Sequence, residues 1–118
     1  MAATASLRPI RGMTAVILTD NLDLSLLRRF PCDVYLRVIG VSEATAICRE
    51  ALADAALQVS VRDAEIKAAL STALRLDLSR HECPNAATGI GGIILIARFA
   101  EPAIGRDGGI EFVQAEVA

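Results

Sequence analysis

Tryptophan is absent from the chain, and aromatic side chains make up only 3% of it. Because 53% of the residues are nonetheless hydrophobic, the core has to be built from aliphatic side chains and alanine. The length of 118 residues suffices for one domain and leaves no room for a second. Such an apolar excess in a small domain predicts a surface that a partner covers, and a homodimer is the simplest way to cover it.

An excess of positive charge is also missing. Twelve Lys and Arg stand against 14 Asp and Glu, which gives a formal net charge of -2. Non-specific binding to long nucleic acids depends on many Lys and Arg contacts with phosphates, so the sequence predicts no long nucleic acid partner. A small anionic ligand held by a few local groups stays compatible with this balance.

No hydrophobic run is long enough for a membrane span, since the longest, residues 90–97, has the length of one strand. Residues 1–12 lack the hydrophobic stretch of a signal peptide, so we expect a flexible N-terminal extension followed by a single α/β domain over residues 13–118. The three cysteines stand far apart and form no CxxC pair. These features predict reduced thiols and a cytoplasmic location without membrane contact.

Metal and cofactor motifs are lacking as well. His81, Glu82 and Cys83 stand together, but zinc requires three or four ligands and no second ligand pair stands at a usable spacing. No third group is marked to orient a His81 and Cys83 nucleophile pair. The run Gly89–Gly92 lacks the spacing of a phosphate-binding loop and leads into a strand instead of a helix. The sequence therefore predicts no metal and no cofactor.

The hydrophobic periodicity predicts an α/β fold with a mixed sheet of about five strands flanked by about three helices. The strands are expected at Thr14–Thr19, Asp33–Val41, Leu57–Val61, Ile93–Phe99 and Ile110–Val117. The helices are expected as a short one capped by Asp23, one over Glu43–Ala56 with Ser42 as N-cap, and one from Asp63 to about Leu74 or Leu76. The polar stretch between Asp77 and Gly92 is interpreted as a loop or an irregular edge strand.

Polar side chains follow several of the predicted strands. The turn Thr19–Asp23 comes after the first strand, Ser60–Asp63 leads into the third helix, and Arg98 and Glu101 end the fourth strand. Strand ends and the loops after them are where a sheet delivers functional groups to a pocket. We therefore expect these three features to converge.

The run Val16–Leu27, followed by Phe30 and Pro31, resembles the opening of a family of small α/β proteins from archaeal viruses, phages and prokaryotes. That family includes the viral type III anti-CRISPR ring nucleases, which cut cyclic tetra-adenylate. The similarity continues through Val59–Asp63, Ala64–Leu74, Ser79–Arg80, Arg98–Glu101 and Gly109–Val117. The resemblance implies a homodimer with a mixed sheet and a small anionic nucleotide ligand.

The resemblance also implies roles for individual residues. Arg98 corresponds to the family's basic ligand-binding position and Glu101 to its acidic catalytic-loop position, while Thr19–Asp23 corresponds to the loop that holds the nucleotide. On this basis Arg98 and Arg62 would bind phosphate, and Glu101 is the acid or base candidate. Asn21 and Asp23 would contact sugar or base.

Asp63 departs from the family pattern, because it stands where the ring nucleases carry their catalytic histidine. A histidine at a helix start can protonate a leaving oxygen near neutral pH. An ionised aspartate cannot do so without a strongly raised pKa, and it repels an anion at the same helix end. Asp63 is thus both a catalytic candidate by position and an ordinary N-cap by chemistry.

Two functions follow from these observations. In the first, the chain is a diverged ring-nuclease relative that binds a small anionic signal, such as a cyclic oligoadenylate, in a dimer cleft, with weak or absent cleavage. Any cleavage would be metal-independent and would align a ribose 2′-hydroxyl with its neighbouring phosphate. In the alternative, the same fold serves as a structural or protein-interaction homodimer that has no nucleotide ligand.

Overall fold

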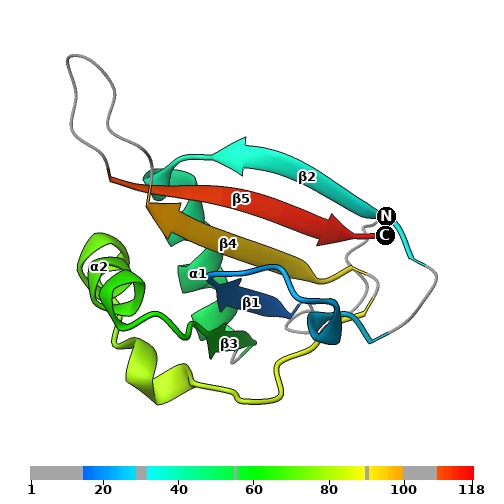
Figure 1. The fold of residues 1–118 in the computed structure, drawn as a ribbon, viewed down its shortest axis with the longest axis horizontal. Coiled ribbons are helices and arrows are strands. Elements are labelled where there is room, and N and C mark those ends of the chain that lie inside the picture. Colours follow the sequence, from blue (N-terminus) through cyan, green and yellow to red (C-terminus); the bar gives the residue numbers. More distant parts are fainter. Residues whose placement is uncertain (1–14, 29–31, 55, 90, 100–108) are drawn as a thin grey trace.

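The computed structural model describes residues 15–28, 32–54, 56–89, 91–99 and 109–118, which form one α/β domain around a five-stranded sheet (Figure 1). The elements follow one another as β1 (Val16–Thr19), η1 (Leu24–Leu26), β2 (Val34–Ile39), α1 (Val41–Ala53), β3 (Leu57–Ser60), α2 (Ala64–Leu74), η2 (Leu78–His81), β4 (Ile93–Phe99) and β5 (Ile110–Val117). Here η1 and η2 are single 3-10 turns. In the described part of the chain, no helix is long and apolar enough to cross a membrane.

The sheet has the strand order β2-β5-β4-β1-β3. Strand β1 runs parallel to both of its neighbours, so that Val16 lies beside Leu57 of β3 and Ile93 of β4. Strand β5 runs antiparallel to both β2 and β4. The predicted mixed sheet of five strands is confirmed.

Helices α1 and α2 cover one face of this sheet and enclose the larger core. Cys48 of α1 and Leu70 and Leu74 of α2 are buried against Leu95 of β4 and Phe112 of β5. Burial raises the pKa of the Cys48 thiol to about 11, so this cysteine is a neutral core residue. Aliphatic side chains and Phe112 fill the core, as the lack of tryptophan predicts.

The opposite face of the sheet has a smaller core beneath irregular segments. Ile17 and Ile94 of the sheet pack there against Leu26 and Leu27 of the η1 segment and against Ala86. The two covering segments are joined by an isolated bridge between Leu27 and Thr88. The face is therefore covered next to β1, and this cover forms one wall of the site below.

Two local predictions need adjustment. The short helix after Asp23 is the 3-10 turn η1, although Asp23 caps it as expected. Helix α1 begins at Val41 with Gly40 as its N-cap, so the assignment of Ser42 as N-cap is wrong. The chain turns at Gly40 directly out of β2, and the Gly40 carbonyl accepts the first helical hydrogen bond from Ala44, 3.0 Å away.

The predicted extension over residues 1–12 lies outside the described residues, and so do Phe30, Pro31 and Glu101.

Candidate functional site

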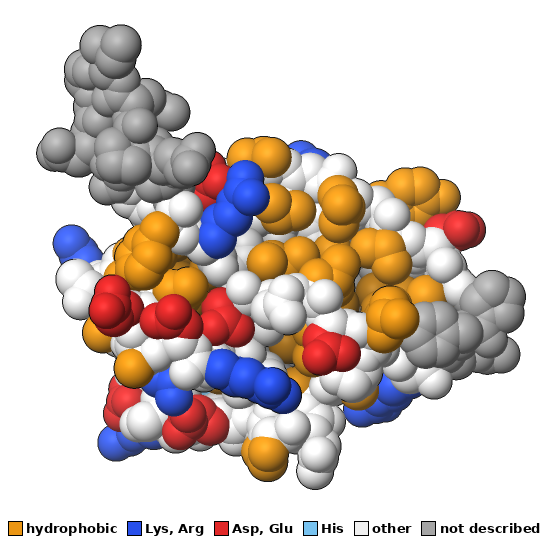
Figure 2. All heavy atoms as spheres, in the orientation of Figure 1, with side chains coloured by type: hydrophobic (Ala, Val, Ile, Leu, Met, Phe, Trp, Pro, Cys, Tyr) orange, Lys and Arg blue, Asp and Glu red, His pale blue; other side chains and the backbone are white. Residues whose placement is uncertain are grey.

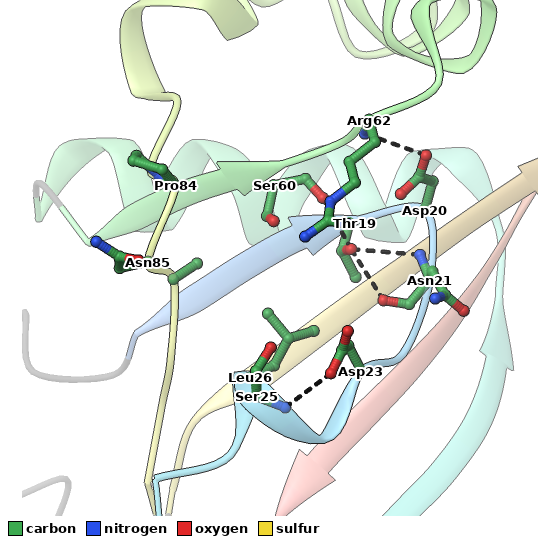
Figure 3. Close-up of a pocket in the computed structure, with 11 residues that line it drawn as sticks. Thr19, Asp20, Asn21, Asp23, Ser25, Leu26, Ser60, Arg62, Pro84 and Asn85 are labelled. Atoms are coloured by element: carbon green, nitrogen blue, oxygen red, sulfur yellow. Dashed lines mark hydrogen bonds between the residues drawn. The ribbon is translucent and has the colours of Figure 1, made fainter.

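A pocket of about 190 Å³ opens at the carboxyl ends of β1 and β3, on the sheet face that η1 covers (Figure 3). Ligands of open α/β sheets generally bind at the carboxyl ends of parallel strands. The lining comes from three segments: the end of β1 with η1, the end of β3, and the segment after η2. The lining residues are Thr19, Asp20, Asn21, Asp23, Ser25, Leu26, Ser60, Arg62, Pro84, Asn85 and Ala86.

Thr19 joins the two strand ends that form the pocket. Its side chain is buried, and its Oγ1 lies 2.9 Å from the Ser60 carbonyl oxygen and 3.0 Å from that of Asn21. The same oxygen accepts a hydrogen bond from the Asn21 N–H over 3.3 Å. Thr19 therefore fixes the loop after β1 in relation to the end of β3.

The start of α2 is occupied by two carboxylates of the protein itself. Asp20 Oδ2 accepts hydrogen bonds from the backbone N–H groups of Arg62 and Asp63, at 3.2 and 2.9 Å. Asp63 Oδ1 accepts from Glu65 and Ile66, at 2.8 and 3.1 Å. The predicted N-cap role of Asp63 is confirmed. These amide groups are the ones that a phosphate would use at a helix start, and here they already have partners.

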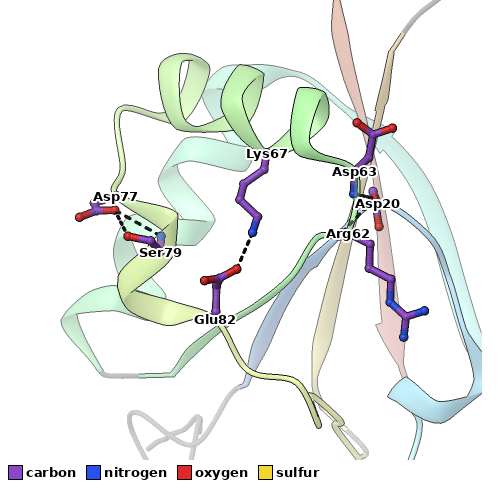
Figure 4. A network of polar contacts seen from close by, with 7 residues as sticks. All are labelled: Asp20, Arg62, Asp63, Lys67, Asp77, Ser79 and Glu82. Atoms are coloured by element: carbon purple, nitrogen blue, oxygen red, sulfur yellow. Dashed lines mark hydrogen bonds and ion pairs between the residues drawn. The ribbon is translucent and has the colours of Figure 1, made fainter.

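Arg62 and Asp63 are neighbours whose side chains point in opposite directions. Figure 4 shows the Asp63 carboxylate on the side of the α2 start and the Arg62 guanidinium directed away from it. Figure 3 shows the Arg62 side chain extending from the end of β3 past Ser60 toward Thr19, into the pocket. Arg62 thus presents its charge to the pocket, whereas Asp63 does not line it.

Asp23 faces the pocket from the start of η1. The Ser25 backbone N–H donates to Asp23 Oδ1 over 2.9 Å. This hydrogen bond holds the pKa of Asp23 below its usual range, with smaller contributions from the Ser25 hydroxyl and from the positive charge of Arg62. Asp23 is therefore ionised at neutral pH, and the cation and the carboxylate influence each other electrostatically within the pocket.

Pro84 and Asn85 supply the third wall, from the segment after η2. This segment is held next to β3 by the Cys83 N–H, which donates to the Val59 carbonyl oxygen over 2.9 Å. An ion pair between Lys67 of α2 and Glu82 fastens it to the helix (Figure 4). Two contacts thus position Asn85, whose amide group offers both donors and an acceptor.

The structure brings together some of the residues singled out from the sequence and separates others. Asn21, Asp23 and Arg62 line one pocket. Arg98 does not line it: this residue forms an ion pair with Glu111, which lies directly opposite on β5. Glu101 lies outside the described residues, so its predicted role has no structural counterpart here.

Sequence reasoning missed two contributions to the pocket. Ser60 and Asn85 line it, although neither was singled out as a ligand contact. Ser60 stands at the carboxyl end of a predicted strand, and that position is a usable signal. Asn85 lies in a segment without periodicity, and its place depends on the pairing of Glu82 with Val59, which is not encoded locally.

Among the described residues, no group of three or more His, Cys, Asp or Glu side chains could hold a metal ion. The chemistry available in the pocket is that of one guanidinium, two carboxylates, two amides and hydroxyl groups. Such a set binds by charge and hydrogen bonding, and it suits a polar ligand that carries both an anionic group and hydroxyl or amino groups.

No protein-family model matches the sequence, and no curated protein matches it either. Among solved structures, the fold is similar to that of B116 of Sulfolobus turreted icosahedral virus (STIV), with a TM-score of 0.68. The alignment covers 86% of this chain and 98% of that chain, at 15% sequence identity. The chain therefore shares the fold of a small viral α/β protein.

Proposed function

We propose that the protein binds a small anionic nucleotide signal, such as a cyclic oligoadenylate, in a cleft that a second copy completes, with weak or absent cleavage. The observation that carries this proposal is the direction of Arg62. Its guanidinium extends into a polar pocket whose facing wall consists of Asn21 and Asp23. A phosphodiester pairs well with a guanidinium, which can donate two parallel hydrogen bonds to it.

The two carboxylates of the pocket set which part of a nucleotide lies where. Asp23 is ionised and accepts hydrogen bonds only, so it suits a ribose hydroxyl or the exocyclic amino group of adenine and repels phosphate. Asn21 can donate and accept. Phosphate is thereby directed to Arg62 and the sugar or base to the loop after β1. Asp20 is held by the amides of Arg62 and Asp63 and serves to shape the pocket.

The size of the pocket explains why a second copy enters the proposal. Pockets for drug-sized ligands have volumes of roughly 300–1,000 Å³, whereas this one measures about 190 Å³. One copy can therefore enclose part of one nucleotide and no complete ring. Two copies around a two-fold axis double each group, which matches a symmetric cyclic ligand. Arg98 does not line the pocket of its own chain, and in this arrangement it would contact a phosphate of the ligand outside that pocket.

The first experiment is calorimetric titration with cyclic adenylates of three, four and six nucleotides, with a linear adenylate of the same length as the control. We expect one ring size to bind more tightly than its linear counterpart, because a preformed ring loses less conformational freedom. No heat of binding for any ring size would contradict the proposal.

Cleavage is tested separately, with labelled cyclic tetra-adenylate. The catalytic candidates are Asp63 and Glu101. The Asp63 carboxylate caps α2 and is directed away from the Arg62 guanidinium. Without a histidine there, general acid catalysis loses its usual contribution of about 10²–10⁴-fold. We expect intact ligand after long incubation with binding retained, which separates sequestration from metal-independent hydrolysis.

A second candidate function is a structural or protein-interaction homodimer without a nucleotide ligand. The observation that favours it is the start of α2, where Asp20 and Asp63 take the amide groups that a phosphate would otherwise use. A protein that forms dimers in solution and binds none of the cyclic adenylates would support this alternative.

A further inference from the structure

A second cavity, of about 370 Å³, lies between α1 and the end of α2. We call it the arginine cavity, because Arg49 of α1 and Arg75 at the end of α2 both line it. Its volume is within the range of roughly 300–1,000 Å³ that is typical of ligand pockets, whereas the pocket beside Arg62 measures about 190 Å³. Helices α1 and α2 cover the sheet face opposite η1, so the two sites lie on opposite faces of the sheet.

The lining of the arginine cavity contains two cations and no carboxylate. Thr45 and Arg49 are four residues apart and therefore share a face of α1, and Arg75 approaches from the other wall. Within the described part of the chain, neither arginine side chain has a salt bridge or a hydrogen-bond partner. On the opposite face of the molecule, several Lys and Arg side chains lie next to Asp or Glu (Figure 2). The cavity thus presents positive charge that its own lining does not neutralise.

Two carboxylates near the ends of this cavity already have partners. Glu43, in the first turn of α1, forms an ion pair with Arg37. Asp77, two residues after Arg75, forms an ion pair with Arg80 over 3.3 Å. Neither of these carboxylates lines the cavity, so an anion that enters it meets the two guanidinium groups first.

The backbone of Arg75 is the second notable feature of the cavity. Arg75 caps α2 in the left-handed conformation, with φ 56° and ψ 47°, and among the described residues it is the only one other than glycine with a positive φ. Gly or Asn usually occupies this position, because a Cβ makes the conformation unfavourable. An unfavourable backbone that retains a large cationic side chain points to a role for that side chain.

We propose that the arginine cavity binds a small phosphorylated compound and that Arg49 and Arg75 hold its phosphate group. Each guanidinium can donate two parallel hydrogen bonds to phosphate oxygens. A phosphate has enough oxygens for both arginines and for the Ser42 hydroxyl, which also lines the cavity, whereas a carboxylate has only two. No side chain caps the start of α1 at Gly40, so amide groups of its first turn can add donors next to Ser42.

The experiment is a titration with inorganic pyrophosphate at constant ionic strength, followed through the backbone amide signals in NMR spectra. Constant ionic strength keeps the screening of surface charges unchanged. We expect the signals of Ser42 and Arg75 to shift until the site is saturated, while that of Asn21, in the pocket beside Arg62, stays in place. Absence of a saturable shift at Ser42 and Arg75 would overturn the proposal.

Three glutamine variants test the two arginines. Arg49→Gln and Arg75→Gln should each bind pyrophosphate at least about tenfold more weakly than the wild type, because a charge-assisted hydrogen bond is lost. Arg28→Gln is the matched control: it removes the same charge from an exposed residue after η1, away from the cavity. It should bind like the wild type. An equal loss of affinity in all three variants would mean non-specific attraction and would contradict the site.

Arg75→Gly separates phosphate binding from a purely structural role. A cation at the end of a helix also interacts favourably with the helix dipole, so arginine could serve α2 alone. Glycine adopts a positive φ without strain, and we therefore expect Arg75→Gly to be at least as stable as the wild type in urea denaturation while its affinity for pyrophosphate is lost. A variant that binds pyrophosphate like the wild type would reject the role of Arg75.

The arginine cavity is independent of the proposed function, and the two can fail separately. Pyrophosphate that shifts only the Asn21 signal rejects the cavity and leaves the pocket beside Arg62 in place. Saturable shifts at Ser42 and Arg75 in a protein that binds no cyclic adenylate keep the cavity and reject the proposed function. Because the two sites lie on opposite faces of the sheet, Arg49→Gln should not change the affinity for cyclic adenylate.

Discussion

At the scale of single residues, Asp63 and Asp20 decide what the start of α2 can do. Their carboxylates accept hydrogen bonds from four backbone N–H groups at this helix start, those of Arg62, Asp63, Glu65 and Ile66. A helix start satisfied in this way is stabilised and has little capacity left for an external anion. In the function that we propose, phosphate recognition therefore depends on the Arg62 side chain, one residue before the cap.

Replacement of Asp63 by alanine should therefore reduce stability and leave ligand affinity largely unchanged. We expect a loss of about 1 kcal/mol in the free energy of unfolding, because Ala provides no capping oxygen. Asp63→Asn is the matched control, and it should retain most of the stability because Asn caps as well as Asp. Urea denaturation measures the stability of both variants. An Asp63→Ala protein as stable as the wild type would contradict the capping role.

Acid should destabilise the protein through Asp23 and Asp77. Hydrogen bonds from Ser25 lower the pKa of Asp23, and the Ser79 hydroxyl, together with its N–H, lowers that of Asp77. The stabilisation is fully present above the unfolded value of about 3.9 and is lost as the pH falls through the folded pKa. In Asp77→Asn, the melting temperature should depend less on pH in this range. A pH profile identical to that of the wild type would contradict the contribution of Asp77.

At the scale of elements, the sequence predicts the bounds of helices and strands well where hydrophobic periodicity determines them. Ile93–Phe99 and Ile110–Val117 are predicted with the bounds of β4 and β5, and Asp63 correctly marks the start of α2. The start of α1 is missed because Ser42 is a good capping residue in sequence, whereas the turn out of β2 at Gly40 is set by the tertiary structure.

The segment that leads into β4 depends on a glycine. A Cβ on Gly92 would lie 1.9 Å from Oγ1 of Thr88, whose side chain is buried. Gly92→Ala should therefore cost about 1–3 kcal/mol through overpacking. Gly89→Ala is the control, because its Cβ would meet nothing within 4 Å. Equal stability of the two variants in urea denaturation would contradict this close packing.

At the scale of the whole molecule, the strand order is what the sequence does not reveal. Strands β1 and β4 are neighbours although Val16 and Ile93 stand far apart in the chain. This order determines that the loops after β1 and β3 meet, and it separates Arg98 from Arg62. Convergence of Thr19–Asp23 with Ser60–Asp63 is expected from their positions after strands, whereas the wall formed by Asn85 depends on non-local pairing.

Phosphate binding by Arg62 is tested most directly by measuring the affinity of three proteins for cyclic adenylate. These are the wild type, Arg62→Gln and Arg49→Gln. Arg49 is an exposed arginine of α1 outside the pocket, which makes it a matched control. Because Arg62→Gln loses a charge-assisted phosphate contact, its affinity should be at least about tenfold lower than that of the wild type, or about 1.4 kcal/mol. Arg49→Gln should bind like the wild type. Equal affinity of all three proteins, or no binding by the wild type, would contradict the account.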